Sequence, residues 1–402
     1  MAGPDRGGGA ILGPTPGADR LLAIVGEYQP DDTATGVQLR TRALVSAMRT
    51  ALPTDVVAVG RLRWSVGCVS QCAGCAVDPV WTAQGAVPFP FRWNACQRAV
   101  EATADAVRRT RYRAVLVSDL ALYRYALAAR TAGSVPLVVD LHNADADLYE
   151  EMCNHPKWTI MEDPVARRMR AGIPAIDAVE RQVIEAADMV TVPSAVDASR
   201  LTRRHGLARD IRVLPNCVPV STPRPAGRTT PTSCVFVGAL GYFPNTMAAL
   251  EIAEGIGPAI RAAVPGIRVV VAGRTPPPVI VGPLADGGIE LVCDPPEVAP
   301  LLRDAIAIVP LRFGGGTRLK ILEAFAAGTP VVSTRKGIEG IEAEPYRHYL
   351  PAEDSAQFGA AVRRIVADPE ADLRCRQAAW DLVTERYSVP ALAGPVRTVL
   401  GL

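Results

Sequence analysis

Lysine is almost missing from this chain of 402 residues. Only three of its 43 basic side chains are lysines, namely Lys157, Lys320 and Lys336, and the other 40 are arginines. Arginine and lysine serve equally well on most solvated surfaces, but they differ where planar geometry or a compact point charge matters. The sequence therefore raises the question of whether these three positions need an ammonium group.

Long charged runs and long apolar runs are missing too. The formal net charge is +2 and no five like charges follow one another, which argues against a nucleic-acid partner. No apolar stretch approaches the ~20 residues of a membrane-spanning helix, and the first residues lack the apolar core of a signal peptide. The nine cysteines, an odd number, suit reduced thiols better than a disulfide framework. We expect a cytoplasmic protein without a transmembrane segment, and the sequence leaves contact with a membrane surface open.

The remaining composition is that of a packed globular protein. Hydrophobic residues make up 49% of the chain and charged residues 21%, which excludes the disordered and fibrous classes. A chain of this length usually folds into two or three domains.

Apolar runs of strand length alternate with helical patterns through the first half of the chain. LLAIV is followed by a glycine-bearing loop and by apolar residues near helical spacing between Val37 and Leu52. The same pattern of a strand-like run followed by a helical segment recurs at DVVAV, AVLVSD, PLVVDLH and MVTVPS. Strands that are apolar on both faces are typical of parallel α/β sheets. We expect a disordered Gly/Pro-rich tail over residues 1–19 and an α/β domain over residues 20–216.

A linker and a second α/β domain follow. Residues 217–232 contain four prolines and many small polar residues, which predicts a linker. CVFVGAL, IRVVVAG, IELVCD, AIAIVPL and TPVVST are again strand-like, so residues 233–385 are expected to form the second domain. Ligands of open α/β sheets bind beyond the carboxyl ends of the strands. Both domains should therefore line one cleft between them.

The most informative stretch runs from Ile308 to Thr334. A strand-like run leads into three consecutive glycines at positions 314–316, and Thr317 is the expected N-cap of the next helix. Gly328 is placed to close that helix before the next strand.

Two cations stand at the start of this predicted helix. Arg318 and Lys320 fall in its first turn, where the helix dipole destabilises a cation by ~0.3–1 kcal/mol. A bound phosphate would reverse that sign, because glycine N–H groups, the helix end and both cations would converge on one anion. Glu323 lies ~9 Å of helix rise beyond the cap, close to the span from a diphosphate to the hydroxyls of its ribose. The alternative is a flexible turn with solvated cations and a surface pair between Glu323 and Lys320.

The same stretch resembles the donor-binding loop and helix of glycosyltransferase family 4, the retaining sugar transferases of GT-B fold, in a branch whose loop reads GGGTRLKILEA. Supporting matches are VGALGYFPN, RVVVAGR and EVAPLLRDAIAIVPL in the second half, and TGVQLRTRAL, VVDLHNADADLYEEM and IRVLPN in the first. The resemblance covers residues 20–400. It implies an α/β fold with two Rossmann-like, doubly wound domains facing a central cleft. The first domain would lie on the acceptor side, the second would bind the nucleotide sugar, and residues 386–402 would cross back to the first as a helix.

The resemblance also implies roles for residues of the loop. Glu323 matches the second glutamate of the family's E-x7-E pair, which holds the nucleotide ribose, and Gly315 replaces the first, which touches the donor sugar in relatives. Many relatives clamp the diphosphate with an Arg and a Lys after the first strand of the second domain, where GALGYFPN has neither. Arg318 and Lys320 are the candidates for the missing cations. The expected donor-binding set also includes Gly316, Thr317 and Leu319.

Further candidates lie outside this loop. His142 follows the strand PLVVD and should face the cleft, where the family's matching histidine approaches the donor sugar or its phosphate; the alternative is a capping or core histidine. Gly36 matches the family's first glycine loop, or is an ordinary turn glycine. Arg274 and Cys293 match positions near the nucleobase. Lys336 lies two residues beyond TPVVST, again at the carboxyl end of a strand.

A D-x-D string is formed by Asp145 and Asp147. Such a string binds a metal ion in the other large glycosyltransferase fold, but here it lies at a helix start in a different architecture. We therefore do not expect a metal site there, and Asn143 is a candidate N-cap of that helix.

CVSQCAGC contains a second metal-like pattern. Cys68, Cys72 and Cys75 have the cluster-binding spacing of radical SAM enzymes. Gly74 stands where those enzymes usually have an aromatic residue, and the string does not open a barrel, so radical SAM chemistry is not expected. A structural zinc with Cys96 as fourth ligand and a set of free thiols remain as alternatives.

These features predict an enzyme that moves a sugar from a nucleoside diphosphate, expected to be UDP, to a small-molecule or glycan acceptor without a cofactor. Retention of anomeric configuration is implied by the resemblance. The expected catalytic residues are His142, Arg318, Lys320 and Glu323. A nucleotide-sugar epimerase of GT-B fold and a non-catalytic partner of a true transferase are the alternatives.

Overall fold

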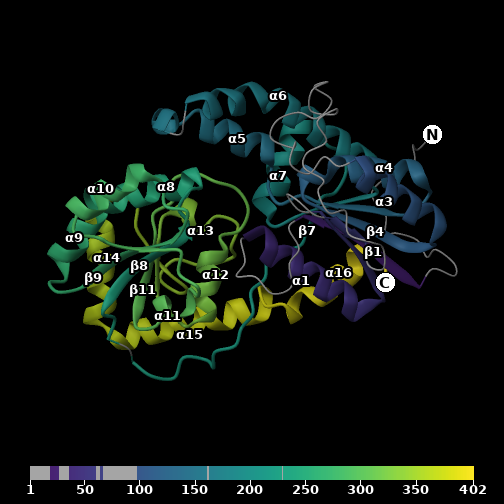
Figure 1. Cartoon of the computed structure of the whole chain (residues 1–402). Helices are drawn as coiled ribbons and strands as arrows, with labels where there is room; N and C mark the ends of the chain where they lie inside the picture. The colour runs from purple at the N-terminus through teal and green to yellow at the C-terminus, as the bar shows by residue number, and fades with distance from the viewer. Residues whose placement is uncertain (1–18, 27–35, 60–63, 67–96, 161–162, 229) are drawn as a thin grey trace, which may run out of the picture.

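The computed structural model of the chain describes residues 19–26, 36–59, 64–66, 97–160, 163–228 and 230–402. These residues form two α/β domains that lie side by side (Figure 1). Every strand predicted from the ten apolar runs is present. Three short strands are added at sheet edges: β3 (Trp64–Val66), β7 (Arg212–Val213) and β13 (Leu350–Pro351). Short edge strands carry few apolar residues, so their sequences gave no signal.

Seven strands form the first sheet in the order β3-β2-β1-β4-β5-β6-β7, and only the edge pair β2–β3 is antiparallel. Alternate residues of β1 point to different cores: Leu22 and Ile24 to one face, Leu21, Ala23 and Val25 to the other. This double burial explains the continuous apolar runs. The strands are β1 (Arg20–Gly26), β2 (Thr54–Val59), β3 (Trp64–Val66), β4 (Tyr112–Ser118), β5 (Leu137–Asp140), β6 (Met189–Val192) and β7 (Arg212–Val213), and the helices are α1 (Gly36–Ala51), α3 (Gln97–Arg109), α4 (Tyr123–Ala132), α5 (Asp145–Cys153), α6 (Asp163–Ala186) and α7 (Ala195–His205).

Six parallel strands form the second sheet in the order β10-β9-β8-β11-β12-β13. No helix in the described ranges combines the length and apolar character that a membrane span needs. The strands are β8 (Ser233–Ala239), β9 (Arg268–Arg274), β10 (Glu290–Cys293), β11 (Ala305–Val309), β12 (Val331–Ser333) and β13 (Leu350–Pro351), and the helices are α8 (Phe243–Glu251), α9 (Gly257–Ala263), α10 (Pro278–Asp286), α11 (Ala299–Leu302), α12 (Leu319–Ala326), α13 (Arg335–Ile338), α14 (Ser355–Ala367), α15 (Pro369–Arg386) and α16 (Ala393–Val399).

In both sheets the strand order reverses beside the first strand. The reversal lies between β1 and β4 in the first sheet and between β8 and β11 in the second. Loops leave such a reversal in opposite directions, so a crevice opens at the carboxyl ends of the two strands and is the usual ligand site of doubly wound folds. We therefore expect ligand-binding residues in the segments that follow these four strands.

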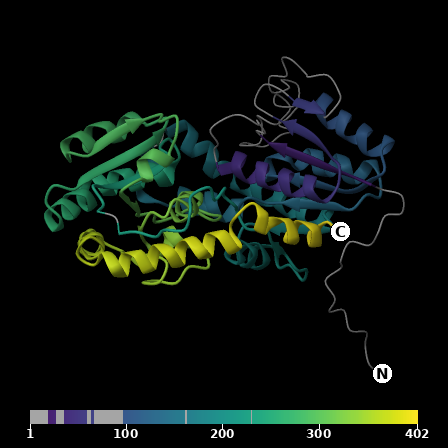
Figure 2. The same cartoon turned by 90° about the horizontal axis from the view of Figure 1, so that it is seen from below.

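Each domain contributes side chains to the core of the other. Helices α15 and α16 run from the second domain to the first (Figure 2), and Val396 and Val399 join the core that includes α1. In return, Met152 of α5 and Trp158 join the core of the second domain, where the Trp158 ring meets the Phe243 ring edge-on at 4.7 Å. This mutual burial of apolar surface holds the domains together.

A buried ion pair underlies the carboxyl edge of the first sheet. Arg40 of α1 and Asp140 at the end of β5 are 2% and 0% exposed, and Nε of Arg40 lies 2.9 Å from Oδ2 of Asp140. Arg40 also donates to the carbonyl of Leu214 and to Oδ1 of Asn216, both at 2.9 Å, and Thr191 donates to Asp140 at 2.7 Å. Burial alone would raise the pKa of Asp140, but the charge and hydrogen bonds of Arg40, together with His142 and Thr191, outweigh burial and lower it.

Replacing Arg40 by Met should lower the free energy of unfolding by about 3–5 kcal/mol, because a buried carboxylate loses its charge partner. Urea unfolding followed by circular dichroism measures this loss. Since the pKa of Asp140 is depressed in the parent, its contribution is present above pH ~4 and is lost as the pH falls, so the difference from the variant should shrink in acid. Arg49→Met, on the exposed side of the same helix, is the control and should cost less than about 0.5 kcal/mol. An equal loss in both variants would contradict the assignment.

Candidate active site

The glycine loop, residues 310–318, connects β11 to α12. Gly316 has a φ of 65°, in the region that favours glycine. The prediction that Thr317 caps the helix is wrong, because Arg318 holds the N-cap position and the Thr317 hydroxyl is buried without a partner in the described part of the chain. The Thr317 carbonyl instead accepts a hydrogen bond at 3.3 Å from Nδ2 of Asn216, so the loop turns toward the first domain before the helix begins.

Arg318 is a buried cation with unused hydrogen-bonding capacity. Its side chain folds back so that one terminal nitrogen donates to the carbonyls of Gly315 and Gly316, the latter at 3.1 Å. The residue is 8% exposed, and among described residues nothing pairs with its Nε or with its second terminal nitrogen. Burial lowers the pKa of Arg318, with Tyr242 among the groups that oppose this. Unpaired N–H groups on a buried guanidinium are costly, and an anion would satisfy them.

Lys320 reaches from α12 across to the first strand of the second sheet. Its ammonium donates to Oδ1 of Asn245 at 2.7 Å and lies 4.1 Å from the ring centre of Phe236. Burial and, to a smaller extent, the Arg318 charge lower the pKa of Lys320 to about 7, against the opposing effect of Glu323. Burial likewise raises the pKa of Glu323 to about 7. Within the described part of the chain no side chain forms a hydrogen bond with the Glu323 carboxylate, so it is free to accept one from a ligand.

Arg274 and Cys293 extend this edge of the second sheet. Arg274 ends β9 opposite Ala239 of β8, and Cys293 ends β10 opposite Gly273 of β9. The strand order β10-β9-β8-β11 therefore places the two residues in a row that leads from the sheet edge to Lys320. Cys293 is exposed and Arg274 half-buried.

His142 lies in the first domain, two residues beyond the end of β5 and next to the glycine loop. Its Nε2 lies 2.8 Å from Oγ of Ser118, whose hydroxyl donates to Asp140 at 3.0 Å. Because the hydroxyl proton goes to Asp140, the imidazole must donate from Nε2, which leaves Nδ1 as an acceptor 3.9 Å from Asp119. Burial lowers the pKa of His142 although Asp119 and Asp140 oppose it, so the ring is neutral near pH 7.

The glycine loop touches the first domain directly. Gly316 donates its backbone N–H to Asp197 of α7 at 3.2 Å. A Cβ added to Gly315 would lie 2.9 Å from Oδ1 of Asn143, a distance that real side chains do not show. Only a glycine at this position allows the two domains to approach so closely.

The first helix of the chain makes a further contact with α12. A Cβ on Gly36, the first residue of α1, would lie 3.2 Å from Cδ1 of Leu319, and one on Gly316 would lie 3.1 Å from the carbonyl oxygen of His142. The structure thus gathers seven of the predicted site residues where the domains meet, and Lys320 and Glu323 follow on α12 within the second domain. The seven are Gly36, His142, Gly315, Gly316, Thr317, Arg318 and Leu319.

The two other lysines also lie where the domains meet. Lys336 of α13 pairs with Glu339 at 2.9 Å and with Glu151 of α5 at 3.2 Å. Lys157 lies 3.5 Å from Glu254 of the second domain. Both ammonium groups are thus used in pairs with carboxylates.

The D-x-D string is engaged by protein groups. Asp147 pairs with Arg204 at 2.6 Å, and Asp145 accepts from Nδ2 of Asn143 at 3.2 Å. The N-cap of α5 is Ala144, so the predicted capping role of Asn143 is wrong; its amide is held by Asp145 instead. No group of His, Cys, Asp and Glu in the ranges given above could hold a metal ion.

The cysteine cluster predicted as a possible zinc site lies outside the described residues, with all four members, Cys68, Cys72, Cys75 and Cys96. The described cysteines are free thiols: Cys153, Cys217, Cys234, Cys293 and Cys375.

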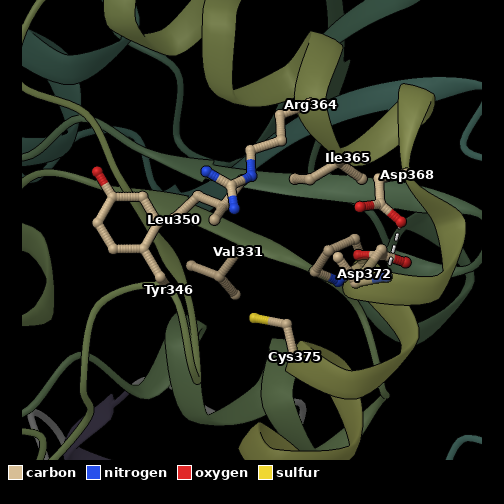
Figure 3. A pocket seen from close by; sticks show the side chains of 10 residues that line it. Val331, Tyr346, Leu350, Arg364, Ile365, Asp368, Asp372 and Cys375 are labelled. Carbon is tan, nitrogen blue, oxygen red and sulfur yellow. Dashed lines mark hydrogen bonds between the residues drawn. The ribbon is translucent and has the colours of Figure 1, made fainter.

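A second recess lies at the opposite end of the second sheet (Figure 3). Val331 and Leu350, at the amino ends of β12 and β13, line it together with Arg364 and Cys375. Burial raises the pKa of Cys375 to about 12, so this thiol stays protonated near neutral pH and is a poor nucleophile. The residues where the glycine loop meets the first domain are therefore the better candidates for chemistry.

Several residues of the site were not predicted from the sequence. The motifs AVLVSD and PLVVDLH end strands, so the general preference for ligands at strand ends could have singled out their polar residues. GALGYFPN contains no cation, and nothing in its sequence marks its asparagine as the partner of a lysine 75 residues further along. The missed residues are Arg40, Ser118, Asp119, Asp140, Asp197, Asn216 and Asn245.

Replacing Gly315 by Leu should hold the domains apart, because the new side chain would occupy the space of Asn143. We expect a larger radius of gyration by small-angle X-ray scattering and a loss of about 1–3 kcal/mol in stability. Removing the obstacle in Gly315→Leu/Asn143→Gly should restore much of the compact form. Gly282→Leu, at an exposed position with no heavy atom within 4 Å of the added Cβ, is the control. An unchanged radius for Gly315→Leu would rule out the close approach.

Two family models match this chain, one over each domain. Residues 35–217 match the family model described as glycosyl transferase 4-like domain, and residues 231–368 match that of glycosyl transferases group 1. A search of curated protein sequences finds no match.

Solved structures share the whole architecture at low sequence identity. Sucrose-phosphate synthase from Thermosynechococcus elongatus is 17% identical, with a TM-score of 0.69 over 94% of this chain and 97% of its own. HepE from Anabaena, solved with UDP-glucose, is 12% identical, with a TM-score of 0.61 over 94% of this chain and 98% of its own. A UDP-forming trehalose-phosphate synthase from Burkholderia xenovorans is 13% identical, with a TM-score of 0.60 over 95% of this chain and 98% of its own. The fold is GT-B, and with one glycosyl transferase model matching each domain, this chain belongs to the glycosyl transferases.

Proposed function

We propose that this protein transfers a sugar from a UDP-sugar to a small-molecule or glycan acceptor, in the cytoplasm and with retention of anomeric configuration. The observation that carries the proposal is the Arg318 guanidinium, which is buried beside three glycines and has two nitrogens without a partner among the described residues. Such a group costs stability unless an anion pairs with it, and a diphosphate is an anion of suitable shape and charge. Lys320 adds a second cation to the same place.

The donor would lie along the carboxyl edge of the second sheet. Its diphosphate would rest on the glycine loop between Arg318 and Lys320, and its ribose would reach Glu323. The base would lie toward Arg274 and Cys293, at the ends of β9 and β10. A UDP donor is supported by two neighbours of the same fold: HepE was solved with UDP and with UDP-glucose, and the Burkholderia trehalose-phosphate synthase is UDP-forming.

Catalysis would consist mainly of stabilising the departing UDP. Negative charge grows on the leaving phosphate as the glycosidic C–O bond breaks, and fixed cations lower the energy of that state. His142 would accept a hydrogen bond from a sugar hydroxyl through Nδ1, because Ser118 engages Nε2. A front-face reaction needs no protein nucleophile, and we assign none. The contacts of Gly315 and Gly316 with the first domain would exclude water from the closed site.

Two alternatives are separated by one experiment. The protein is incubated with UDP-sugars alone and with mixed acceptors, and the products are identified by mass spectrometry and NMR. A transferase forms a glycoside only with acceptor, whereas an epimerase of the same fold converts the donor without one. A non-catalytic partner of a true transferase turns over nothing, and its Lys320→Ala/Glu323→Ala variant would leave the partner's activity unchanged.

Arg318→Met should weaken UDP binding about 10- to 100-fold, because charge-assisted hydrogen bonds to the diphosphate are lost. Isothermal titration calorimetry with UDP gives the dissociation constant. Arg312→Met is the matched control, since Arg312 belongs to the same loop but pairs with Glu251 and Glu353. Its affinity for UDP should stay within about twofold of the parent. Equal affinities for all three proteins would refute the phosphate assignment.

UDP binding at pH 8 should take up a proton. Lys320, with a pKa of about 7, is mostly neutral at that pH, and a diphosphate favours its charged form. Calorimetry in two buffers of different ionisation enthalpy measures the uptake. The signal should disappear in Lys320→Met and persist in the control Lys157→Met, whose ammonium pairs with Glu254 instead. Uptake that survives in Lys320→Met would assign the proton to another group.

A further inference from the structure

The position of the Lys320 ammonium is fixed by side chains of two neighbouring elements, not by its own helix. It belongs to α12, yet its ammonium meets Asn245 of α8 and the ring of Phe236 in β8. The space it enters exists because position 238 is a glycine: a Cβ on Gly238 would lie 2.9 Å from Nζ of Lys320. A long lysine side chain has many rotamers in water, so this placement must be enforced by its surroundings.

Asn245 is itself held firmly. It is 7% exposed, its backbone N–H donates to the carbonyl of Tyr242 at 2.8 Å, and its Nδ2 donates to the carbonyl of Ala239 at 2.8 Å. Because Nδ2 is used by Ala239, the amide orientation is fixed and Oδ1 must face Lys320. An acceptor at a fixed place thus determines where the ammonium lies.

We propose that Asn245 is a positioning residue, which holds the Lys320 side chain at the phosphate end of the donor site and favours its charged form over the neutral amine. The proposal rests on the function proposed above, since it assigns Lys320 to the leaving diphosphate. It also accounts for a cation delivered from α12 in a protein whose segment after β8 has none of its own. Asn245 would act only through Lys320 and would not touch the reacting atoms.

The charge state of Lys320 depends on few groups. Arg318, at the N-cap of α12, opposes the ammonium and Glu323, one turn along, supports it. The neutral amide of Asn245 contacts the ammonium from α8, and the ring face of Phe236, which attracts a cation, contacts it from β8. Removing the amide acceptor should therefore disfavour the charged form, and placing a carboxylate there should favour it.

The scarcity of lysine makes this testable on the free protein. With only three lysines in the chain, protein labelled with ¹³Cε,¹⁵Nζ-lysine gives few side-chain signals, and Lys157→Arg and Lys336→Arg identify the other two. In the parent, the Lys320 signal should titrate near pH 7. In Asn245→Leu the midpoint should fall, and in Asn245→Asp it should rise, each by about one pH unit. Thermal unfolding of each variant confirms that it is folded.

Thr246→Val is the matched control. Thr246 follows Asn245 in the same turn and donates to the carbonyl of Leu240 at 2.7 Å, but it does not contact Lys320. Its variant should leave the Lys320 midpoint unchanged. The proposal is overturned if neither Asn245 variant moves the midpoint, if both move it in the same direction, or if Thr246→Val moves it as far. Should Asn245→Leu fail to fold, the direction of the shift in Asn245→Asp still decides.

UDP binding separates this proposal from the proposed function. A midpoint lowered by one unit leaves about tenfold less charged lysine at pH 8 but only about twofold less at pH 6. Asn245→Leu should therefore bind UDP about tenfold more weakly at pH 8 and about twofold more weakly at pH 6. If the midpoint shifts as expected while UDP affinity does not change at either pH, Asn245 still positions Lys320, and the assignment of Lys320 to the diphosphate fails.

Discussion

The buried pair of Arg40 and Asp140 is the constraint on which the site depends. Arg40 donates to both oxygens of Asp140, and its other terminal nitrogen donates to the carbonyl of Leu214 and to Oδ1 of Asn216. Because Arg40 holds Oδ1, the orientation of the Asn216 amide is fixed, and its Nδ2 donates to the carbonyl of Thr317. The ion pair inside the first domain thus fixes the glycine loop of the second. A buried pair is weak evidence for stability as such, but it specifies one arrangement strongly, since breaking it leaves an isolated charge.

The second domain also contains buried charged groups, here with few hydrogen-bond partners. Arg318 and Lys320 are withdrawn from water before any ligand arrives, and the protein supplies carbonyl and amide oxygens instead of carboxylates at hydrogen-bonding distance. Burial consequently lowers the pKa of both groups. A site of unpaired donors fixed in place favours an anion without reorganising, which is the electrostatic condition for stabilising a leaving phosphate. Glycines of the loop contact the first domain beside this site. Lys157 of the first domain pairs with Glu254 of the second, and Lys336 of the second domain pairs with Glu151 of the first.

The periodicity of apolar residues predicted the fold well, because it reports directly on burial. All ten strands expected from apolar runs are present, and the GT-B architecture followed from the resemblance of the loop that contains Arg318 and Lys320. Capping was predicted less well. Thr317 and Asn143 have the residue types of N-caps, yet their carbonyl and amide groups are committed to Asn216 and Asp145, which lie elsewhere in space or along the helix. Residue type did not decide these caps: among the described residues the Thr317 hydroxyl has no partner, and the Asn143 amide donates to Asp145 two residues along.

The sequence by itself determined where cations stand at a glycine loop, which strands are buried on both faces, and that a lysine at position 320 is unusual in an arginine-rich chain. Only the tertiary structure decided what those cations meet. The neutral tautomer of His142 depends on Ser118 and Asp140, and the placement of Lys320 depends on Asn245, which precedes it by 75 residues. The reason is physical: periodicity and composition report on burial and local geometry, whereas the charge state of a buried group is set by the few atoms packed against it, and those come from distant parts of the chain.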